Sequence, residues 1–191
     1  CILLAALVWL GSVVADRRYL NEHVIRLHVV ANSDSEKDQQ VKLKVRDAIL
    51  SVTEPMLTGC QDPNAVIGAS LTDIQRAARK CLLENGCDVP VSVTLGPEYL
   101  PTRIYDTFSL PAGVYETLRV TIDAGEGHNW WCVVFPSICL TAAGDMENVA
   151  ACAGFSQKEI ALITEENRGY VVKFKLMELV QMLQDKLIDF R

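Results

Sequence analysis

The sequence has little positive charge with which to bind a polyanion. Lysine and arginine together number 18, aspartate and glutamate number 24, and the formal net charge is −6 with an isoelectric point of about 5.1. No run of basic residues is longer than the pair Arg17-Arg18. Because binding to a nucleic-acid backbone requires a cluster of positive charge, we expect no nucleic acid among the partners.

Catalytic side chains are also scarce. The only histidines are His23, His28 and His128, and no serine lies in a nucleophile-elbow sequence. Cys132 lies near His128 in the sequence, but it is inside an apolar run that disfavours the reactive thiolate. A hydrolase needs a nucleophile, a base and an orienting group, so we predict no catalytic residues.

Known cofactor and metal motifs are missing as well. Asp106-Thr107 is followed by Phe108 and not by the glycine of an aspartic-protease loop, and the cysteines show no Cys-x-x-Cys spacing. The glycines of Gly125-Glu126-Gly127 are not followed by the helix that a nucleotide fingerprint requires. We therefore predict neither a cofactor nor a bound metal.

Residues 1–15 form an apolar run without any charge, followed directly by Asp16-Arg17-Arg18. A helix of this length covers about 22 Å, less than the roughly 30 Å of a bilayer core, and small residues end the run. We predict a signal peptide or the remnant of a membrane anchor, with a buried N-terminal helix as the alternative.

The remaining residues, 16–191, have the composition of one folded domain. Residues 24–31 alternate as a strand does, and Asn32–Ser35 then offers capping side chains for a helix that we expect to end near Pro55. A second amphipathic helix is predicted over 65–84. Strands are expected over 91–95, 104–110, 118–122 and 130–135, a loop over 142–154, and a C-terminal helix over 174–189.

These elements predict an α+β fold, with a mostly antiparallel sheet of four to five strands, two helices packed on one face and a C-terminal helix. The strand over 130–135 is apolar on both faces, so we place it inside the sheet. Its two tryptophans would make a binding anchor if one side were left in water; otherwise the C-terminal helix or the loop over 96–102 covers them.

Three blocks of the sequence are distinctive. They are His28–Ser35 with Asp38-Gln39 and Leu43–Ala48; Pro101–Tyr105 with Leu110–Gly113, Tyr115 and Leu118–Val120; and Gly127–Pro136 with Cys139. In this order and spacing they resemble the stage II sporulation protein R family of endospore-forming bacteria, over roughly residues 20–140.

That resemblance implies a signalling protein and not an enzyme. Such a protein is made in the forespore and secreted across the forespore membrane into the intermembrane space between forespore and mother cell. It activates a membrane-embedded aspartic protease, the stage II sporulation protein GA type, which then processes pro-sigma-E. The apolar segment 1–15 agrees with export. The alternatives are an exported cell-envelope hydrolase and an envelope-anchored assembly protein.

The resemblance supplies no contact surface, so the residues must suggest one. Arg26 and His28 share a strand face and either form a polar patch or are a buried pair bonded to neighbouring strands or to Asp47. Cys132 and Cys139 are a candidate disulfide in an oxidising compartment, and reduced, buried thiols are the alternative. We predict the following partner-binding residues: Arg26, His28, Asn32, Ser33, Asp34, His128, Asn129, Trp130 and Trp131.

Overall fold

The computed structural model describes residues 15, 18–105, 108–138, 146–157, 160 and 163. The chain divides into two compact units. The first takes the described residues of Cys1–His23, Tyr99–Val114 and Phe155–Arg191, and the second comprises those of Val24–Glu98 and Tyr115–Gly154. The predicted single domain over 16–191 stays a prediction, because compactness alone does not show which parts fold independently.

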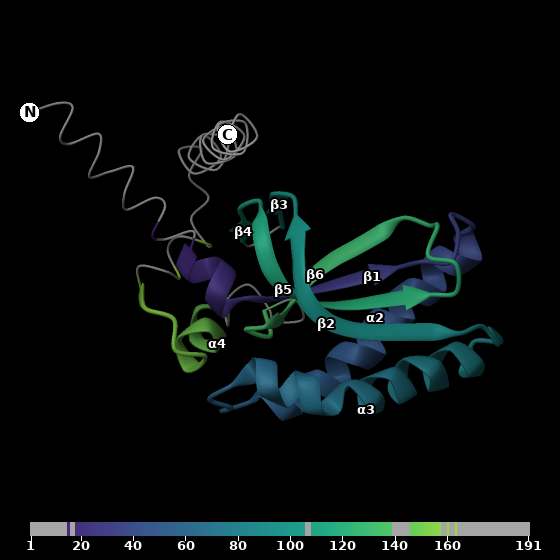
Figure 1. Cartoon of the computed structure of the whole chain (residues 1–191), viewed down its shortest axis with the longest axis horizontal. Coiled ribbons are helices and arrows are strands. Elements are labelled where there is room, and N and C mark those ends of the chain that lie inside the picture. Colours follow the sequence, from purple (N-terminus) through teal and green to yellow (C-terminus); the bar gives the residue numbers. More distant parts are fainter. Residues whose placement is uncertain are drawn as a thin grey trace, which may run out of the picture. The chain divides into compact units, whose positions relative to one another are not determined.

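A four-stranded sheet is the centre of the fold (Figure 1). Its order is β2-β5-β1-β6, formed by β1 (Ile25–Val30), β2 (Val91–Leu100), β5 (Gly113–Ile122) and β6 (Asn129–Phe135). β1 is parallel to β5 and antiparallel to β6, and all six of its residues are buried. The sheet is mostly antiparallel, which confirms the predicted fold class.

The predicted position of β6 inside the sheet is wrong. Among the described residues β6 is an edge strand, and β1 and β5 are the inner ones. Apolar residues on both faces of β6 show only that both faces are covered: Cys132 and Val134 belong to the core, and Val133 on the other face is also buried. Coverage of the faces says nothing about which neighbours a strand has along the hydrogen-bonding direction.

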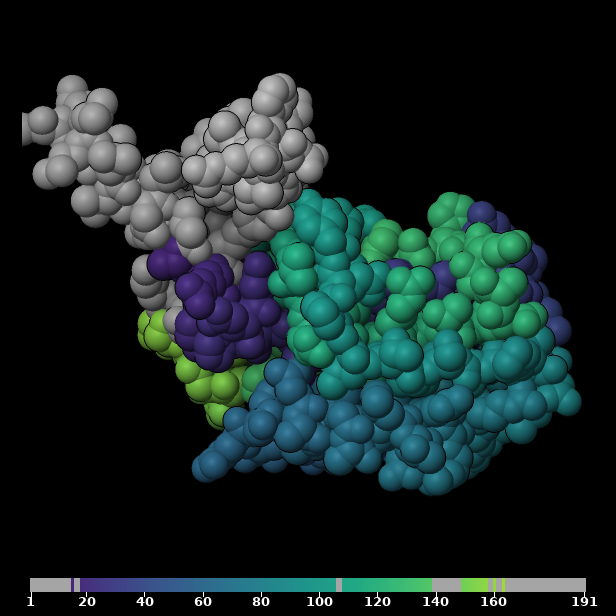
Figure 2. All heavy atoms as spheres, viewed as in Figure 1, coloured from purple at the N-terminus to yellow at the C-terminus, as the bar shows by residue number. Residues whose placement is uncertain are grey.

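Helices α2 (Glu36–Leu57) and α3 (Pro63–Glu84) pack together on one face of the sheet (Figure 1). The hydroxyl of Ser35 caps α2 by accepting the N–H of Asp38 at 3.1 Å, and Asp62 caps α3 by accepting the N–H of Ala65 at 3.0 Å. The outer face of α3 is exposed (Figure 2) and carries the ion pair of Arg76 with Asp73.

α2 continues beyond its predicted end, through Pro55 to Leu57. A proline in the last turn removes only the hydrogen bond to the carbonyl of Ser51, and Ser51 is exposed, so water can replace that bond. Burial of Leu57 then favours the extra turn. The core beneath the helices contains Leu27, Val45, Ile74, Leu82, Leu118, Val120 and Val134.

Two predicted loops contain regular structure. Residues 96–100 belong to β2, where Pro97 is tolerated because β2 is an edge strand and can lack one N–H donor. Residues Met146–Cys152 form α4, although we predict a loop there, because two turns are too short to show a helical period. Burial of Ala150 holds this helix in place. The C-terminal helix predicted over 174–189 lies outside the described residues.

In the first unit, β3 (Arg103–Ile104) and β4 (Ser109–Leu110) form a small hairpin. The rings of Tyr105 and Phe108 stack at 4.3 Å, and the N–H of Ala112 donates to the hydroxyl of Thr102 at 3.0 Å. No helix in the described part of the chain combines the length and apolarity that a membrane span requires. Except for Ala15, the apolar segment 1–15 lies outside that part.

Candidate functional site

Two turns that contain predicted partner-binding residues lie side by side in the structure. One is Asn32–Ser35, which follows β1, and the other is residues 125–129, which joins β5 to β6; we call them together the turn cluster. They meet because β1 lies between β5 and β6 and ends where those two strands are connected. The N–H of Glu126 donates to the carbonyl of Asn32 at 3.1 Å, and the N–H of Gly127 donates to that of Ala31 at 2.9 Å.

Gly127 allows this close approach. A Cβ atom at this position would lie 2.3 Å from the carbonyl oxygen of Ser33 and 2.9 Å from the Cβ of Ala31. Both atoms belong to the backbone or are fixed to it, so neither can rotate away. The spacing between the two turns therefore depends on the absence of a side chain at residue 127.

The side chains of Asp34 and His128 link the two turns on the surface. The Oδ1 atom of Asp34 accepts the backbone N–H of His128 at 2.6 Å and also contacts its Nδ1. Both side chains are more than half exposed. Below them, the ammonium of buried Lys42 donates to Gln39 Oε1 at 2.6 Å and to the carbonyl of His128 at 2.9 Å, and burial lowers the pKa of Lys42.

Asp38 organises the first turn from within α2. Its Oδ2 accepts the hydroxyl of Ser33 at 2.6 Å and the amide of Asn32 at 3.1 Å. The hydrogen bond from Ser33 is the largest cause that lowers the pKa of Asp38, and the bond from Asn32 acts in the same direction. The ionised carboxylate therefore stabilises this turn.

Replacing Asp38 with asparagine is expected to lower the free energy of unfolding by about 1 kcal/mol at pH 7. Because the pKa of Asp38 is lower in the folded state, its contribution is complete above the unfolded pKa near ~3.9 and is lost as pH falls through the folded pKa. Urea unfolding of both proteins at pH 7 and near pH ~3 measures this. Asp73→Asn on the exposed face of α3 is the control, and a difference independent of pH would contradict the assignment.

A row of polar side chains crosses the face of the sheet opposite the helices. His28 on β1 contacts Glu98 of β2 through Nδ1 at 2.8 Å and Asn129 of β6 through Nε2 at 3.0 Å. Glu98 also accepts from Arg119 of β5 at 2.9 Å. His28 is only 4% exposed. This row connects all four strands and ends in the turn cluster at Asn129.

The chain was compared with protein families, with curated proteins and with solved structures. Residues 21–145, which include both turns and the whole sheet, match the family model described as stage II sporulation protein R. The chain is 32% identical over 183 residues to stage II sporulation protein R of Bacillus subtilis (strain 168), which covers 85% of this chain and 82% of the relative. No solved structure matches the chain significantly.

The chain belongs to the stage II sporulation protein R family. This identification confirms the family predicted from the sequence and makes the chain a sporulation protein. The residues matched by the family model end just before α4, so the turn cluster and the polar row lie inside the matched region.

In this member of the stage II sporulation protein R family, the predicted polar patch is interior. Arg26 is 0% exposed, its Nε donates to the carbonyl of Cys132 at 3.2 Å, and its guanidinium lies 5.1 Å from the centre of the Tyr115 ring. His28 is bonded to neighbouring strands, whereas Asp47 pairs with Arg46. A surface patch made by Arg26 and His28 is therefore wrong, because both side chains are buried.

The tryptophans of β6 point to opposite faces of the sheet. Trp130 is on the helix side, where the guanidinium of Arg46 lies 4.6 Å from its ring centre, and Trp131 stacks on His28 at 5.5 Å. Both are half-buried. The partner-binding roles of Asn32, Ser33, Asp34, His128, Asn129, Trp130 and Trp131 stay predictions, with Asp34, His128 and Asn129 the exposed ones.

The cysteines of this family member fall into two groups. Cys60, Cys81, Cys87 and Cys152 are free, and the first three lie in or against the core of the helical layer. Cys132 is disulfide-bonded. Cys139 lies outside the described residues, so its predicted pairing with Cys132 stays a prediction. Within the described part of the chain, no group of three or more His, Cys, Asp or Glu side chains is arranged to hold a metal.

Sequence reasoning missed Glu98, Arg119 and Lys42. Glu98 and Arg119 look like solvent-facing residues of alternating strands, and only the strand order shows that both reach the row that contains His28. Lys42 lies between apolar Val41 and Leu43 on α2. A lysine at an apolar helical position is a signal of a buried ammonium with fixed acceptors.

Proposed function

We propose that this protein is the exported signal by which the forespore activates a membrane-embedded aspartic protease of the stage II sporulation protein GA type. The activated protease would then process pro-sigma-E in the mother cell. The proposed site of action is the space between the two membranes, reached by secretion across the forespore membrane. Membership of the stage II sporulation protein R family is the observation that carries this proposal.

The turn cluster is the surface that we propose for contact with the protease. Asp34 and His128 are exposed, yet hydrogen bonds from two segments hold them in place. Groups fixed before binding lose less conformational freedom when a partner docks, which favours affinity. Half-buried Asp38 holds the first turn through Ser33, and buried Lys42 holds the second through the carbonyl of His128, so the surface is preorganised by the fold.

Reconstitution tests the function directly. The full chain is added to proteoliposomes that contain the protease and to pro-sigma-E, and the mature product is quantified by gel electrophoresis. We expect processing to require the chain. Equal processing without the chain would contradict the proposal.

His128→Ala is expected to weaken activation by about tenfold or more, the usual effect of losing a central contact residue. The backbone N–H of His128 still reaches Asp34, so the unfolding free energy should change by less than about 0.5 kcal/mol. Dose-response curves in the processing assay measure the activation. Arg76→Ala on the outer face of α3 is the control and should behave like the unchanged protein. Full activity of His128→Ala would place the contact elsewhere.

The contact between His128 and Asp34 also favours a second candidate, an exported hydrolase of the cell envelope. A histidine held by a carboxylate is two parts of a hydrolytic triad. The hydroxyl of nearby Ser33, however, donates to Asp38. Incubation of the same preparation with cell-wall fragments and peptide substrates separates the candidates, because turnover supports only the hydrolase.

N-terminal sequencing of the mature protein tests an envelope-anchored assembly role, which requires that residues 1–15 be retained.

A further inference from the structure

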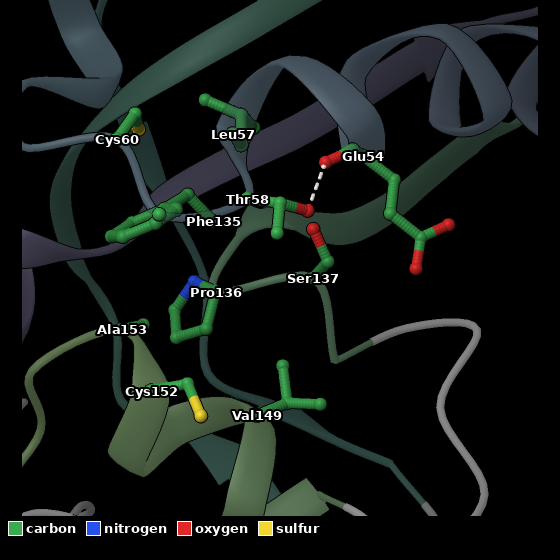
Figure 3. Close-up of a pocket in the computed structure, with 11 residues that line it drawn as sticks. Glu54, Leu57, Thr58, Cys60, Phe135, Pro136, Ser137, Val149, Cys152 and Ala153 are labelled. Carbon is green, nitrogen blue, oxygen red and sulfur yellow. Dashed lines mark hydrogen bonds between the residues drawn. The ribbon is translucent and has the colours of Figure 1, made fainter.

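A pocket of about 250 Å³ lies at the C-terminal end of α2, where the loop after α2, the end of β6 and α4 come together (Figure 3). The lining residues that the structure describes all belong to the second unit. We call it the apolar pocket. It is at the opposite end of α2 from the turn cluster, because Ser35 caps the first turn of this helix and Leu57 is its last residue.

The walls of the apolar pocket present hydrocarbon. Leu57, Phe135, Pro136, Val149 and Ala153 line it, together with the free thiols of Cys60 and Cys152. The hydroxyls of the described lining residues are used within the protein. Thr58 donates to the carbonyl of Glu54 at 2.9 Å (Figure 3), and Ser137 donates to that of Val134 at 3.2 Å. The walls therefore favour an apolar occupant.

The volume and the charge of the apolar pocket narrow the class of occupant. It is smaller than the roughly 300–1,000 Å³ of typical small-molecule sites, which suits a single side chain. Among the described lining residues, Glu54 is the charged one, and it is exposed. The C-terminal end of α2 adds partial negative charge, and neither α2 nor α4 has a basic residue in its last turn to offset it.

We infer that the apolar pocket binds an apolar side chain of a partner protein, next to a lysine or arginine that pairs with Glu54. The apolar walls select the side chain, and the negative rim selects its basic neighbour. This inference rests on the proposed function, because it assumes that the protein acts by binding another protein. It adds a second contact at the far end of α2.

Protection of Cys152 from alkylation tests the inference. Cys152 is free, exposed and part of the lining, so an occupied pocket should slow its reaction with iodoacetamide. The rate of this alkylation is measured by mass spectrometry. The full chain is held in lipid nanodiscs, which avoid free detergent. The probes are three acetylated and amidated tripeptides: Lys-Phe-Lys, Glu-Phe-Glu and Lys-Ser-Lys. Free Cys87, which does not line the pocket, is the internal control.

We expect saturating Lys-Phe-Lys to slow alkylation of Cys152 by about fivefold or more. Each of the other two peptides should slow it by less than about twofold. Glu54→Gln should raise the concentration of Lys-Phe-Lys that gives half-maximal protection by about threefold, the effect of losing an exposed ion pair. Glu36→Gln at the other end of α2 should not change it. Val149→Trp, which fills the pocket, should abolish protection by Lys-Phe-Lys.

Absence of protection by Lys-Phe-Lys, or equal protection by Glu-Phe-Glu, would overturn the inference. The processing assay separates this failure from failure of the proposed function. A chain that activates the protease but shows no protection has a different contact surface. A chain that shows protection but leaves pro-sigma-E unprocessed has a pocket of this chemistry but not the proposed role.

Discussion

Substitution of Gly127 by alanine is expected to lower the free energy of unfolding by about 3 kcal/mol, the upper part of the usual range for overpacking. The added Cβ would lie 2.3 Å from the carbonyl oxygen of Ser33 and 2.6 Å from its carbonyl carbon. The two turns must separate, and the hydrogen bonds from Glu126 to Asn32 and from Gly127 to Ala31 are then lost or lengthened. Urea denaturation followed by tryptophan fluorescence measures the effect.

Gly96→Ala is the matched control for this substitution. A Cβ atom on Gly96 meets no atom within 4 Å, and the residue lies in the edge strand β2. Its unfolding free energy should change by less than about 0.5 kcal/mol. Equal stabilities of Gly127→Ala and Gly96→Ala would show that the contact between the turns is loose.

Arg26→Ala is expected to lower the unfolding free energy by about 3–4 kcal/mol, as removal of one member of a buried polar arrangement usually does. The substitution removes the donor to the carbonyl of Cys132 and the stacking of the guanidinium on Tyr115. It also leaves a cavity, because Arg26 is fully buried. Urea denaturation at pH 7 measures this loss.

The control is Arg76→Ala, in which an arginine that is 71% exposed is removed from α3. An exposed ion pair contributes about 0–1 kcal/mol, so the unfolding free energy should change little. If Arg26→Ala were as stable as this control and instead failed to activate the protease, Arg26 would be a contact residue after all.

Local signals in the sequence predicted the beginning of each main helix well. Short side chains at Asn32–Ser35 predict the start of α2, and Ser35 is the residue that caps it. The period of the second helix predicts α3, which starts two residues earlier because Asp62 and Pro63 form its N-terminus. These features depend on neighbouring residues, which is why they can be seen in the sequence.

Features that depend on strand order could not be predicted in the same way. The edge position of β6 and the parallel pairing of β1 with β5 arise from the path of the whole chain. The same limit applies to the candidate site. Asn32–Ser35 and His128 are predicted as separate segments, and only the hairpin between β5 and β6 brings them together. Burial of Arg26 could not be predicted from the sequence either, because an arginine in an alternating strand usually lies on a solvent-exposed face.

The pairing of β1 has a consequence for the export that we propose. Ile25 is aligned with Glu116 of β5 on one side and with Phe135 of β6 on the other. Both neighbouring strands therefore lie much later in the sequence than β1. A chain threaded through a secretion channel from its amino end would deliver β1 long before either neighbour arrives. Contacts so distant in sequence form slowly. In such an export, the central sheet would be completed only after Phe135 has crossed.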